Sequence, residues 1–239
     1  MLLHGLTATR RYVVMGSKAL ERSGHRVIAY DARGHGRSEP AEPYDYPALV
    51  ADLERVLDER SIDRAVLAGA SMGAHTLLRF ALDHPERARA LVAITPAYDP
   101  ADFPGDLERW DALADGLERG GVEGFVESYG PITGPWAETI ERVLRQRLSL
   151  HEHPEAVAQA LRQVPRSRPF DSLDQLAGLQ LPVTIVPSRD EADPGHPHSV
   201  GEAYARAIPG ARLVVEDEGS SPIAWQGGQL SRVIAEAVR

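Results

Sequence analysis

Short, almost wholly apolar runs recur along the chain and alternate with amphipathic stretches. The apolar runs cover residues 26–30, 65–69, 90–95, 182–186 and 212–216. Their β-branched content and lack of polar alternation are typical of strands buried on both faces of a parallel sheet. The intervening segments have the apolar spacing of helices, and they cover residues 10–23, 47–57, 72–83, 199–208 and 224–238. This alternation predicts an α/β fold with a doubly wound, mostly parallel sheet.

The alternation stops between residues 98 and 180. Four groups of apolar residues at helical spacing, separated by prolines and glycines, occupy residues 107–117, 122–129, 140–148 and 157–164. Because no strand interrupts them, we interpret residues 98–180 as a helical insertion that lies over the sheet. Residues 1–97 and 181–239 then form the core that contains the sheet.

The first strand raises a question of its own. The stretch "LLHG" at residues 2–5 resembles the end of a buried strand, although only one residue precedes it. Either this strand is very short or further strands lie upstream of this chain. We therefore expect the N-terminal strands of the sheet to be reduced or absent.

Composition narrows the class of protein. The net charge is −9, which argues against a surface for nucleic acid or anionic membranes. The chain has no cysteine, which excludes disulfides, thiolate metal sites and a cysteine nucleophile. No apolar run approaches the ~20 residues of a membrane span, and the N-terminus lacks the pattern of a signal peptide. We expect a cytoplasmic protein, monomeric or homodimeric, that uses neither a cofactor nor a metal.

The stretch "GASMG" at residues 69–73 fits the pattern Gly-x-Ser-x-Gly and stands between a predicted strand and a predicted helix. Glycines allow the sharp turn that lifts the Ser71 hydroxyl above the carboxyl end of the sheet. Free amides at the start of the helix favour developing negative charge there. An ordinary tight turn also gives this pattern, so the motif alone does not decide the function.

Two further motifs precede this one. "HG" at residues 4–5 ends the first predicted strand, and "DARGHGRS" at residues 31–38 follows the second. The three motifs, in this order and on these elements, resemble the α/β-hydrolase fold family. The resemblance covers residues 2–97 and continues from residue 181, and it makes the helical insertion the lid. It implies that the amides of Leu6 and Met72 form an oxyanion hole for a reaction at Ser71.

The resemblance places the catalytic acid after the strand 182–186. In "VPSRDEADP", Asp190 matches best because Pro194 follows it by four residues, and Asp193 is the close alternative. The base is expected behind a glycine after the strand 212–216, where this chain has Ser220. A serine hydroxyl does not titrate near neutral pH and cannot accept the proton of Ser71.

Three other histidines are candidates for the base. His196 and His198 lie near the expected acid, and His75 lies one helical turn after Ser71. Ordinary surface or packing roles explain all three, and we favour His196 as the substitute. Otherwise the chain has lost hydrolysis and only binds a ligand, or Ser220 replaces the histidine of a normal triad by design.

The insertion contains aromatic residues for an apolar pocket: Trp110, Phe125, Tyr129 and Trp136. We therefore expect Ser71 to act on a small, largely apolar ester, lactone or similar carbonyl compound, as the esterases and lactonases of the family do. The alternative is a ligand-binding protein on the same fold without catalysis. A dinucleotide-dependent reductase is excluded, because no Gly-x-Gly-x-x-Gly follows the first predicted strand.

Overall fold

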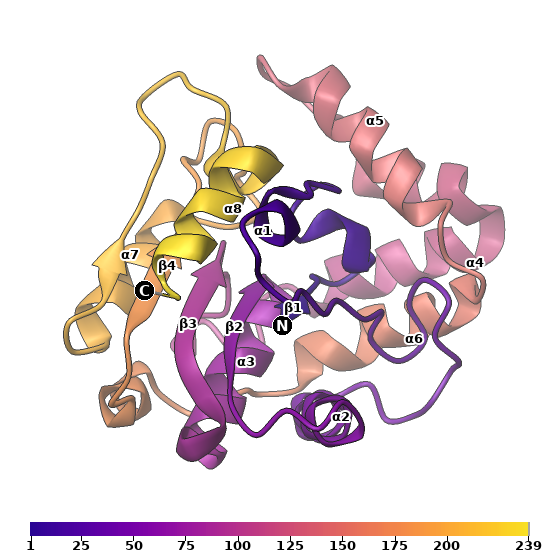
Figure 1. Cartoon of the computed structure of the whole chain (residues 1–239). Coiled ribbons are helices and arrows are strands. Elements are labelled where there is room, and N and C mark those ends of the chain that lie inside the picture. The colour runs from indigo at the N-terminus through magenta and orange to yellow at the C-terminus, as the bar shows by residue number, and fades with distance from the viewer. Residues whose placement is uncertain (239) are drawn as a thin grey trace.

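The computed structural model describes residues 1–238 as a sheet with helices on both faces (Figure 1). The strands are β1 (Leu2–Leu3), β2 (Ala65–Ala70), β3 (Ala88–Ile94), β4 (Val183–Val186) and β5 (Arg212–Leu213). The α-helices are α1 (Ala19–Arg22), α2 (Tyr46–Glu59), α3 (Met72–Asp83), α4 (Leu107–Tyr129), α5 (Ala137–Leu148), α6 (Pro154–Gln163), α7 (His198–Ala207) and α8 (Gly227–Glu236). Short 3₁₀ helices are η1 (Arg10–Tyr12), η2 (Pro85–Arg87), η3 (Val164–Arg166), η4 (Leu173–Gly178) and η5 (Ile223–Trp225).

Within the described residues, the strands form one parallel sheet in the order β1-β2-β3-β4-β5. On its other side, β1 makes a single bridge between Leu2 and Ala29. The chain thus leaves β1 in one direction and crosses back to β2 on the opposite side. In open α/β sheets ligands bind at such a reversal, beyond the carboxyl ends of the strands. Both Leu6 and Ser71 follow strands that end there.

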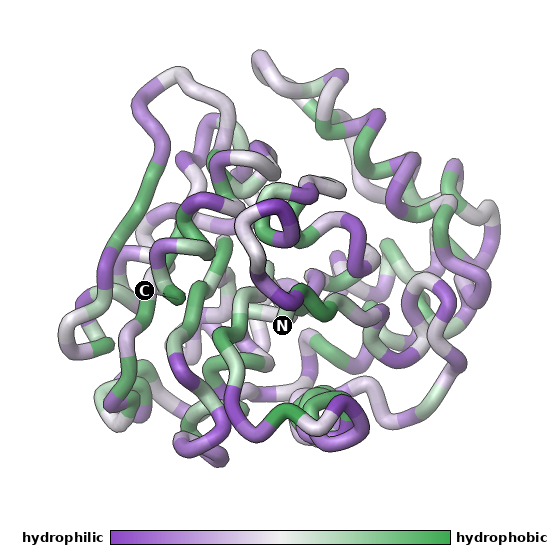
Figure 2. Tube along the Cα trace, viewed as in Figure 1, coloured by the Kyte–Doolittle hydropathy of each residue, from purple (hydrophilic) through white to green (hydrophobic). Residues whose placement is uncertain are grey.

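Side chains of β3 alternate between two apolar cores, as the sequence predicts for a strand covered on both faces. Leu91 and Ala93 belong to the core that α2, α3 and α7 cover, whereas Val92 and Ile94 belong to the core that α1 and α8 cover. Figure 2 shows β2 and β3 as hydrophobic over most of their length. The doubly wound parallel sheet is therefore confirmed.

The predicted elements fail where the backbone leaves its regular conformation or a strand has few partners. Residues 26–30 form only the bridge at Ala29, because β1 offers two residues for pairing. β5 keeps only Arg212 and Leu213, both exposed at the sheet edge, so the expected burial on both faces is wrong there. The helix predicted over residues 10–23 is divided into η1 and α1, because Met15 and Gly16 both adopt positive φ.

The segment between β3 and β4 contains α4, α5 and α6, which lie together beside the β1 side of the sheet (Figure 1). They enclose an apolar cluster of their own that includes Leu117, Phe125, Leu144 and Leu161. The two helices predicted at residues 107–117 and 122–129 are both present within α4, separated by non-helical angles at Gly121 (φ 59°, ψ −140°). The domain boundaries at residues 97 and 181 stay a prediction.

Candidate active site

Ser71 lies at the turn between β2 and α3, with φ 49° and ψ −114°. A positive φ is uncommon for a residue other than glycine, and such strained residues cluster at functional sites. The turn is held from both sides. The Ser71 amide donates to the carbonyl of Ile94 at 2.9 Å, and the His75 amide donates to the Ser71 carbonyl at 3.0 Å. Ser71 is half-buried, and no hydrogen bond from its hydroxyl to another described residue is present.

The glycines around Ser71 are required by close backbone contacts. A Cβ atom on Gly69 would lie 2.5 Å from the carbonyl oxygen of Gly73. A Cβ atom on Gly73 would in turn lie 2.4 Å from the carbonyl oxygen of Leu3. Both distances are shorter than any normal contact, so the helix that carries Ser71 packs this closely on β1 only with glycine present. The structure thus explains the Gly-x-Ser-x-Gly pattern sterically.

The loop after β1 lies directly against the turn of Ser71. A Cβ atom on Gly5 would be 3.3 Å from the Cβ atom of Ser71. The amides of Leu6 and Met72 have no hydrogen-bond acceptor within residues 1–238. Two unpaired donors beside a nucleophile are what an oxyanion hole needs. The assignment of Leu6 and Met72 to that role stays a prediction.

Two buried or half-buried histidines hold the loop after β1 in place. The ring of His4 accepts a hydrogen bond from the Ala32 amide at 2.8 Å through Nε2, so Nδ1 donates to the Gly5 carbonyl at 2.8 Å. Burial lowers the pKa of His4 to about 4, which keeps the ring neutral. His151 accepts from the Gly36 amide at 2.8 Å and donates to the Thr7 carbonyl at 3.1 Å. The loop is therefore tied to its neighbours on both sides.

His75 is placed near Ser71, but both of its ring nitrogens are occupied. Nε2 accepts from the amides of Ala97 and Tyr98, each at 3.1 Å, so Nδ1 carries the proton and faces the Tyr46 hydroxyl at 2.9 Å. Burial, with a smaller effect of the nearby His196, lowers the pKa of His75 to about 3. This geometry is typical of a structural histidine, and it disfavours His75 as the base.

The loop between β4 and α7 brings a carboxylate and a histidine together. His196 Nδ1 lies 2.9 Å from Asp193 Oδ1, and both side chains are partly exposed. Asp190 is exposed, and its Oδ1 accepts the His198 amide at 2.6 Å at the start of α7. His196 also acts electrostatically on His75, which places it toward the helix of Ser71. Of the two aspartates, Asp193 has the histidine partner, and the assignment of Asp190 as the acid stays a prediction.

Ser220 is exposed on a turn after β5, where its amide donates to the Asp217 carbonyl at 3.0 Å. It lines an open polar cleft of about 360 Å³ together with Glu216, Asp217 and Gln226. Ser71 does not line this cleft. Buried Glu216 joins the two loops, because it accepts from the amides of Arg189 at 2.8 Å and Ile223 at 3.2 Å.

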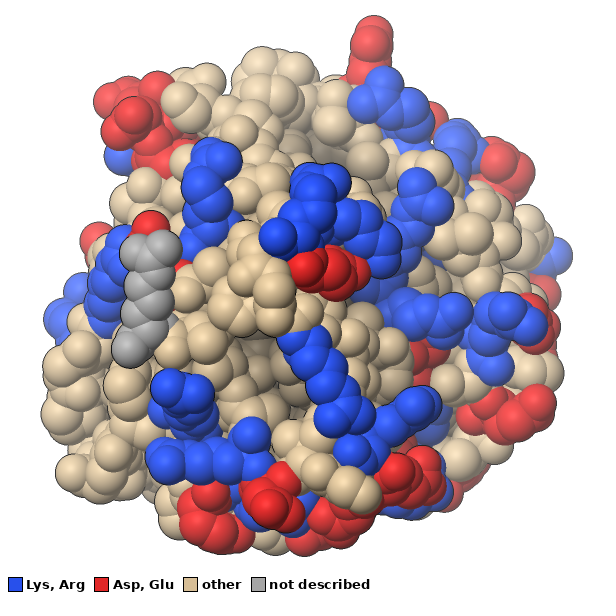
Figure 3. All heavy atoms as spheres, in the orientation of Figure 1, with Lys and Arg blue, Asp and Glu red and all other residues tan. Residues whose placement is uncertain are grey.

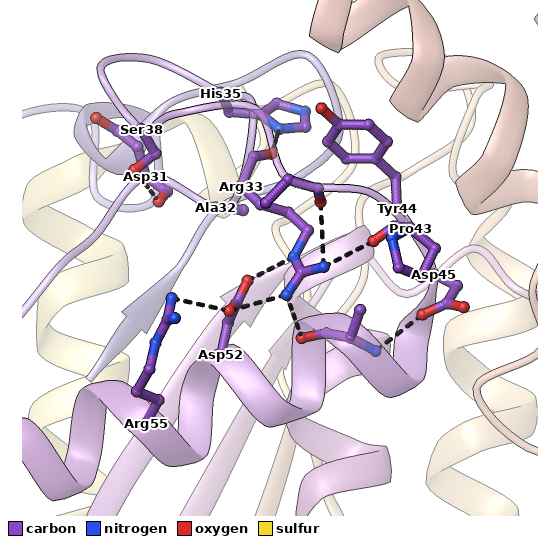
Figure 4. A network of polar contacts seen from close by, with 12 residues as sticks. Asp31, Ala32, Arg33, His35, Ser38, Pro43, Tyr44, Asp45, Asp52 and Arg55 are labelled. Carbon is purple, nitrogen blue, oxygen red and sulfur yellow. Dashed lines mark hydrogen bonds and ion pairs between the residues drawn. The ribbon is translucent and has the colours of Figure 1, made fainter.

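The residues 31–38 form a structural network beside the site (Figure 4). The guanidinium of Arg33 binds both carboxylate oxygens of Asp52, at 2.7 and 3.0 Å, and also the carbonyls of Ala41 and Pro43. The Ser38 hydroxyl donates to the Asp31 carbonyl at 2.7 Å. These contacts close the loop on α2, which is a structural role.

The site combines a strained serine between a strand and a helix, closely packed glycines, and two amides without an acceptor among the described residues. A comparison with known families agrees with this geometry. The model described as alpha/beta hydrolase fold matches residues 1–129, more than half of the chain. The chain belongs to the α/β hydrolase fold family. The relatives of this family member include hydrolases, as the following comparisons show.

RutD of Variovorax paradoxus (strain S110), which bears the name of a carbamate hydrolase, is 30% identical over 179 residues. That match covers 73% of this chain and 66% of RutD. The Xenopus laevis protein named sn-1-specific diacylglycerol lipase ABHD11 is 35% identical over 109 residues, which are 44% of this chain and 35% of ABHD11. The chain thus spans less than two thirds of these relatives' lengths. A thermophilic esterase from Thermogutta terrifontis has a TM-score of 0.81 at 27% identity, covering 100% of this chain and 88% of the esterase.

The aromatic residues predicted to line the pocket of this family member have different surroundings. Phe125 is buried in the apolar cluster of the insertion, whereas Trp110 and Tyr129 pack against that cluster and are half-buried. Trp136 meets Trp225 edge-on, with 6.0 Å between ring centres. The burial of Phe125 is typical of core packing, and the pocket assignments of all four residues stay predictions.

Two polar residues that the sequence did not single out lie near this site. The hydroxyl of Tyr12 and Nε of Arg147 are buried without a hydrogen-bond partner within residues 1–238. No motif contains either residue, so only their spatial placement reveals them. In the same range, no group of three or more histidines or acidic residues is arranged to hold a metal ion. None of the helices described is both long and apolar enough to cross a bilayer.

Proposed function

We propose that this α/β hydrolase fold protein is a serine hydrolase that cleaves a small ester or lactone through Ser71. The observation that supports this most directly is the conformation of Ser71, strained at the end of β2 and adjacent to two amides that have no acceptor among the described residues. Strain of this kind persists only where the surrounding structure enforces it, and here close glycine contacts do so. The hydrolase relatives support the same reaction class.

The base in this proposal is His196, oriented by Asp193. A carboxylate at Nδ1 fixes the ring and leaves Nε2 to exchange protons, which is the arrangement of a catalytic triad. The chain order nucleophile, acid, base is the order found in α/β hydrolases, with acid and base here three residues apart. No hydrogen bond joins His196 to Ser71 in this structure. Catalytic hydrogen bonds are often long in free enzymes and tighten when substrate binds.

The reaction follows from these positions. The Ser71 hydroxyl attacks the substrate carbonyl and transfers its proton to Nε2 of His196. The amides of Leu6 and Met72 stabilise the negative oxygen of the tetrahedral intermediate. His196 then protonates the leaving alkoxide, which leaves an acyl group on Ser71. Water, deprotonated by His196, attacks this acyl group and releases the acid and the free serine.

A fluorophosphonate probe tests the nucleophile, because it reacts only with an activated serine. We expect covalent labelling at Ser71, detected by mass spectrometry of the peptide, and a burst of p-nitrophenol from p-nitrophenyl butyrate. The control is Ser71→Ala, which leaves every other serine in place. Labelling of wild type no stronger than that of Ser71→Ala would rule out the hydrolase.

The second candidate function is ligand binding without turnover. It is favoured by the exposed turn at Ser220, where the family places its base and this chain has none. In that case neither labelling nor a burst occurs, while a small carbonyl compound binds saturably. Asp193 and His196 would then be a surface pair with no catalytic effect.

A further inference from the structure

Arg147 differs from the other arginine of its helical turn. Arg145, two residues earlier in α5, pairs with Glu141 at 2.9 Å and with Glu123 on the exposed face. The guanidinium of Arg147 makes no ion pair and no hydrogen bond with any residue in 1–238, although its Nε is buried. The two terminal nitrogens are not among the buried atoms without partners, so they reach solvent. An unpaired buried donor is costly, which makes a missing partner the natural explanation.

Tyr12 is the second unpartnered donor of this region, and it is close to Arg147. Its hydroxyl is buried without a hydrogen-bond partner among the described residues. Burial raises the pKa of the Tyr12 phenol, and the charges of Arg11 and Arg147 oppose that rise. Burial also lowers the pKa of Arg147, with Tyr129, Asp193 and Tyr12 opposing it electrostatically. The two donors thus belong to one cluster that also adjoins Asp193.

This cluster adjoins the candidate active site. Tyr12 ends η1, which follows the loop of Leu6, and Leu6 packs against both the insertion and the core residues around Met72. The end of α5 is fixed to that loop by His151, which donates to the Thr7 carbonyl at 3.1 Å. Figure 3 shows lysine and arginine side chains gathered on the face where α1 and α5 lie, although the chain as a whole has a charge of −9.

We propose that Arg147 and Tyr12 form a subsite for a carboxylate of the substrate, so that the preferred ester or lactone carries a free acid at the end remote from the scissile bond. A guanidinium binds a planar carboxylate through two parallel hydrogen bonds, and a phenol adds a third donor. The proposal deepens the hydrolase assignment and rests on it for the identity of the reacting group. It replaces the expectation of a largely apolar substrate.

The rival role for Arg147 is to neutralise Asp193. The structure disfavours it, because Asp193 Oδ1 is bound to His196 and no ion pair joins Asp193 to Arg147. The two roles differ in their effect on substrates. A counter-ion of Asp193 supports turnover of every ester equally, whereas a carboxylate subsite supports only esters that carry the acid.

Two isosteric esters separate these roles. Mono-p-nitrophenyl adipate ends in a carboxylate, whereas p-nitrophenyl 6-methylheptanoate ends in an isopropyl group of the same shape. We expect Arg147→Met to lower kcat/KM for the adipate about tenfold or more, mainly through KM, and to leave the neutral ester within about twofold. Tyr12→Phe acts in the same direction with a smaller effect, and Arg147→Lys restores part of the loss. Arg145→Met is the matched control and leaves the ratio of the two esters unchanged. An equal loss on both esters, or none on either, overturns the subsite.

A binding measurement separates this proposal from the hydrolase assignment. Calorimetry with hexanoate and hexanamide needs no turnover, and we expect wild type to bind the carboxylate about tenfold more tightly than the amide. Arg147→Met abolishes that preference, with an unchanged melting temperature showing that the variant is folded. If Ser71 is labelled but hexanoate and hexanamide bind alike, the subsite fails and the hydrolase stands. If the preference is present without labelling of Ser71, the subsite stands and the hydrolase fails.

Discussion

The two halves of the candidate active site are built in different ways. The half that carries Ser71 and Leu6 is made of backbone. A Cβ atom on its glycines would lie only 2.4–2.5 Å from neighbouring carbonyl oxygens, and histidine side chains fix its loops. The half that carries Asp193 and His196 consists of a loop whose fixed point is a side-chain pair at 2.9 Å. Backbone geometry tolerates little change, whereas a side-chain pair can be placed at several positions of a loop. This difference accounts for a familiar nucleophile turn beside the unfamiliar position that we propose for the base.

The largest effect is expected from removing the side chain of His196, on which the second half of the site depends. We expect His196→Ala to lower kcat for p-nitrophenyl butyrate by about 10³-fold or more, because His196 is the base that accepts the proton of Ser71 in the proposed mechanism. Fluorophosphonate labelling of Ser71 slows in parallel. Stopped-flow and steady-state kinetics on the purified variant measure both effects.

His198→Ala is the matched control for this change, since it removes a histidine from the same segment without touching Asp193. We expect kcat of this variant to stay within about twofold of wild type, because His198 takes no part in the proposed mechanism. The opposite pattern, a large loss with His198→Ala and none with His196→Ala, would make Asp190 the relevant acid, because its carboxylate binds the His198 amide.

The stability of the first half can be tested at acidic pH, because two of its histidines, His4 and His75, are buried and neutral. Burial lowers the pKa of His4 from 6.5 to about 4 and that of His75 from 6.5 to about 3. The unfolded chain therefore takes up these protons first as the pH falls below 6.5, and the folded protein loses stability down to those lower values. We expect each histidine to cost about 2 kcal/mol between pH 7 and pH 5.

Urea unfolding at several pH values measures this loss as a change in the free energy of unfolding. In His75→Gln the amide side chain can still accept from Ala97 and donate to Tyr46, but it does not titrate. We expect this variant to show a flatter dependence of stability on pH than wild type. An unchanged slope would mean that the ring of His75 is not held neutral by the fold.

The smallest effect is expected where the family would place its base. Ser220→His puts an imidazole on an exposed turn whose polar cleft Ser71 does not line, so we expect kcat/KM to change by less than about twofold. Glu218→His on the same turn is the control for added charge and bulk. A gain of tenfold or more, confined to Ser220→His, would show that this loop reaches the nucleophile and that the base side is not relocated.

The sequence predicts the first half of the site well, because steric requirements leave a pattern in the chain. Gly69 and Gly73 mark the turn in the sequence because no residue with a Cβ atom fits at these positions. The strands β2, β3 and β4 are visible because burial on both faces demands continuous apolar residues. The extent of β5 was not predictable, since pairing at a sheet edge depends on partners that periodicity does not encode.

The second half could not be predicted because it depends on which way loop side chains point. Asp190 fits the family spacing, yet it is exposed at the start of α7, while Asp193 has the histidine partner. The sequence did contain a signal, an aspartate three residues before a histidine across Pro194 and Gly195. Arg147 and Tyr12 left no signal, because they come from segments 135 residues apart that meet only in the folded chain.

The two amide contacts of the His75 ring have a consequence for exchanging parts between relatives. They hold Ala97 and Tyr98, which lie at the predicted boundary between the core and the helical segment, from the helix that follows Ser71. The contacts of Tyr46 and His75 therefore set the direction in which a foreign insertion grafted at this junction leaves the core. We expect chimeras that keep Tyr46, His75 and the backbone amides of Ala97 and Tyr98 to retain these contacts beside the turn of Ser71.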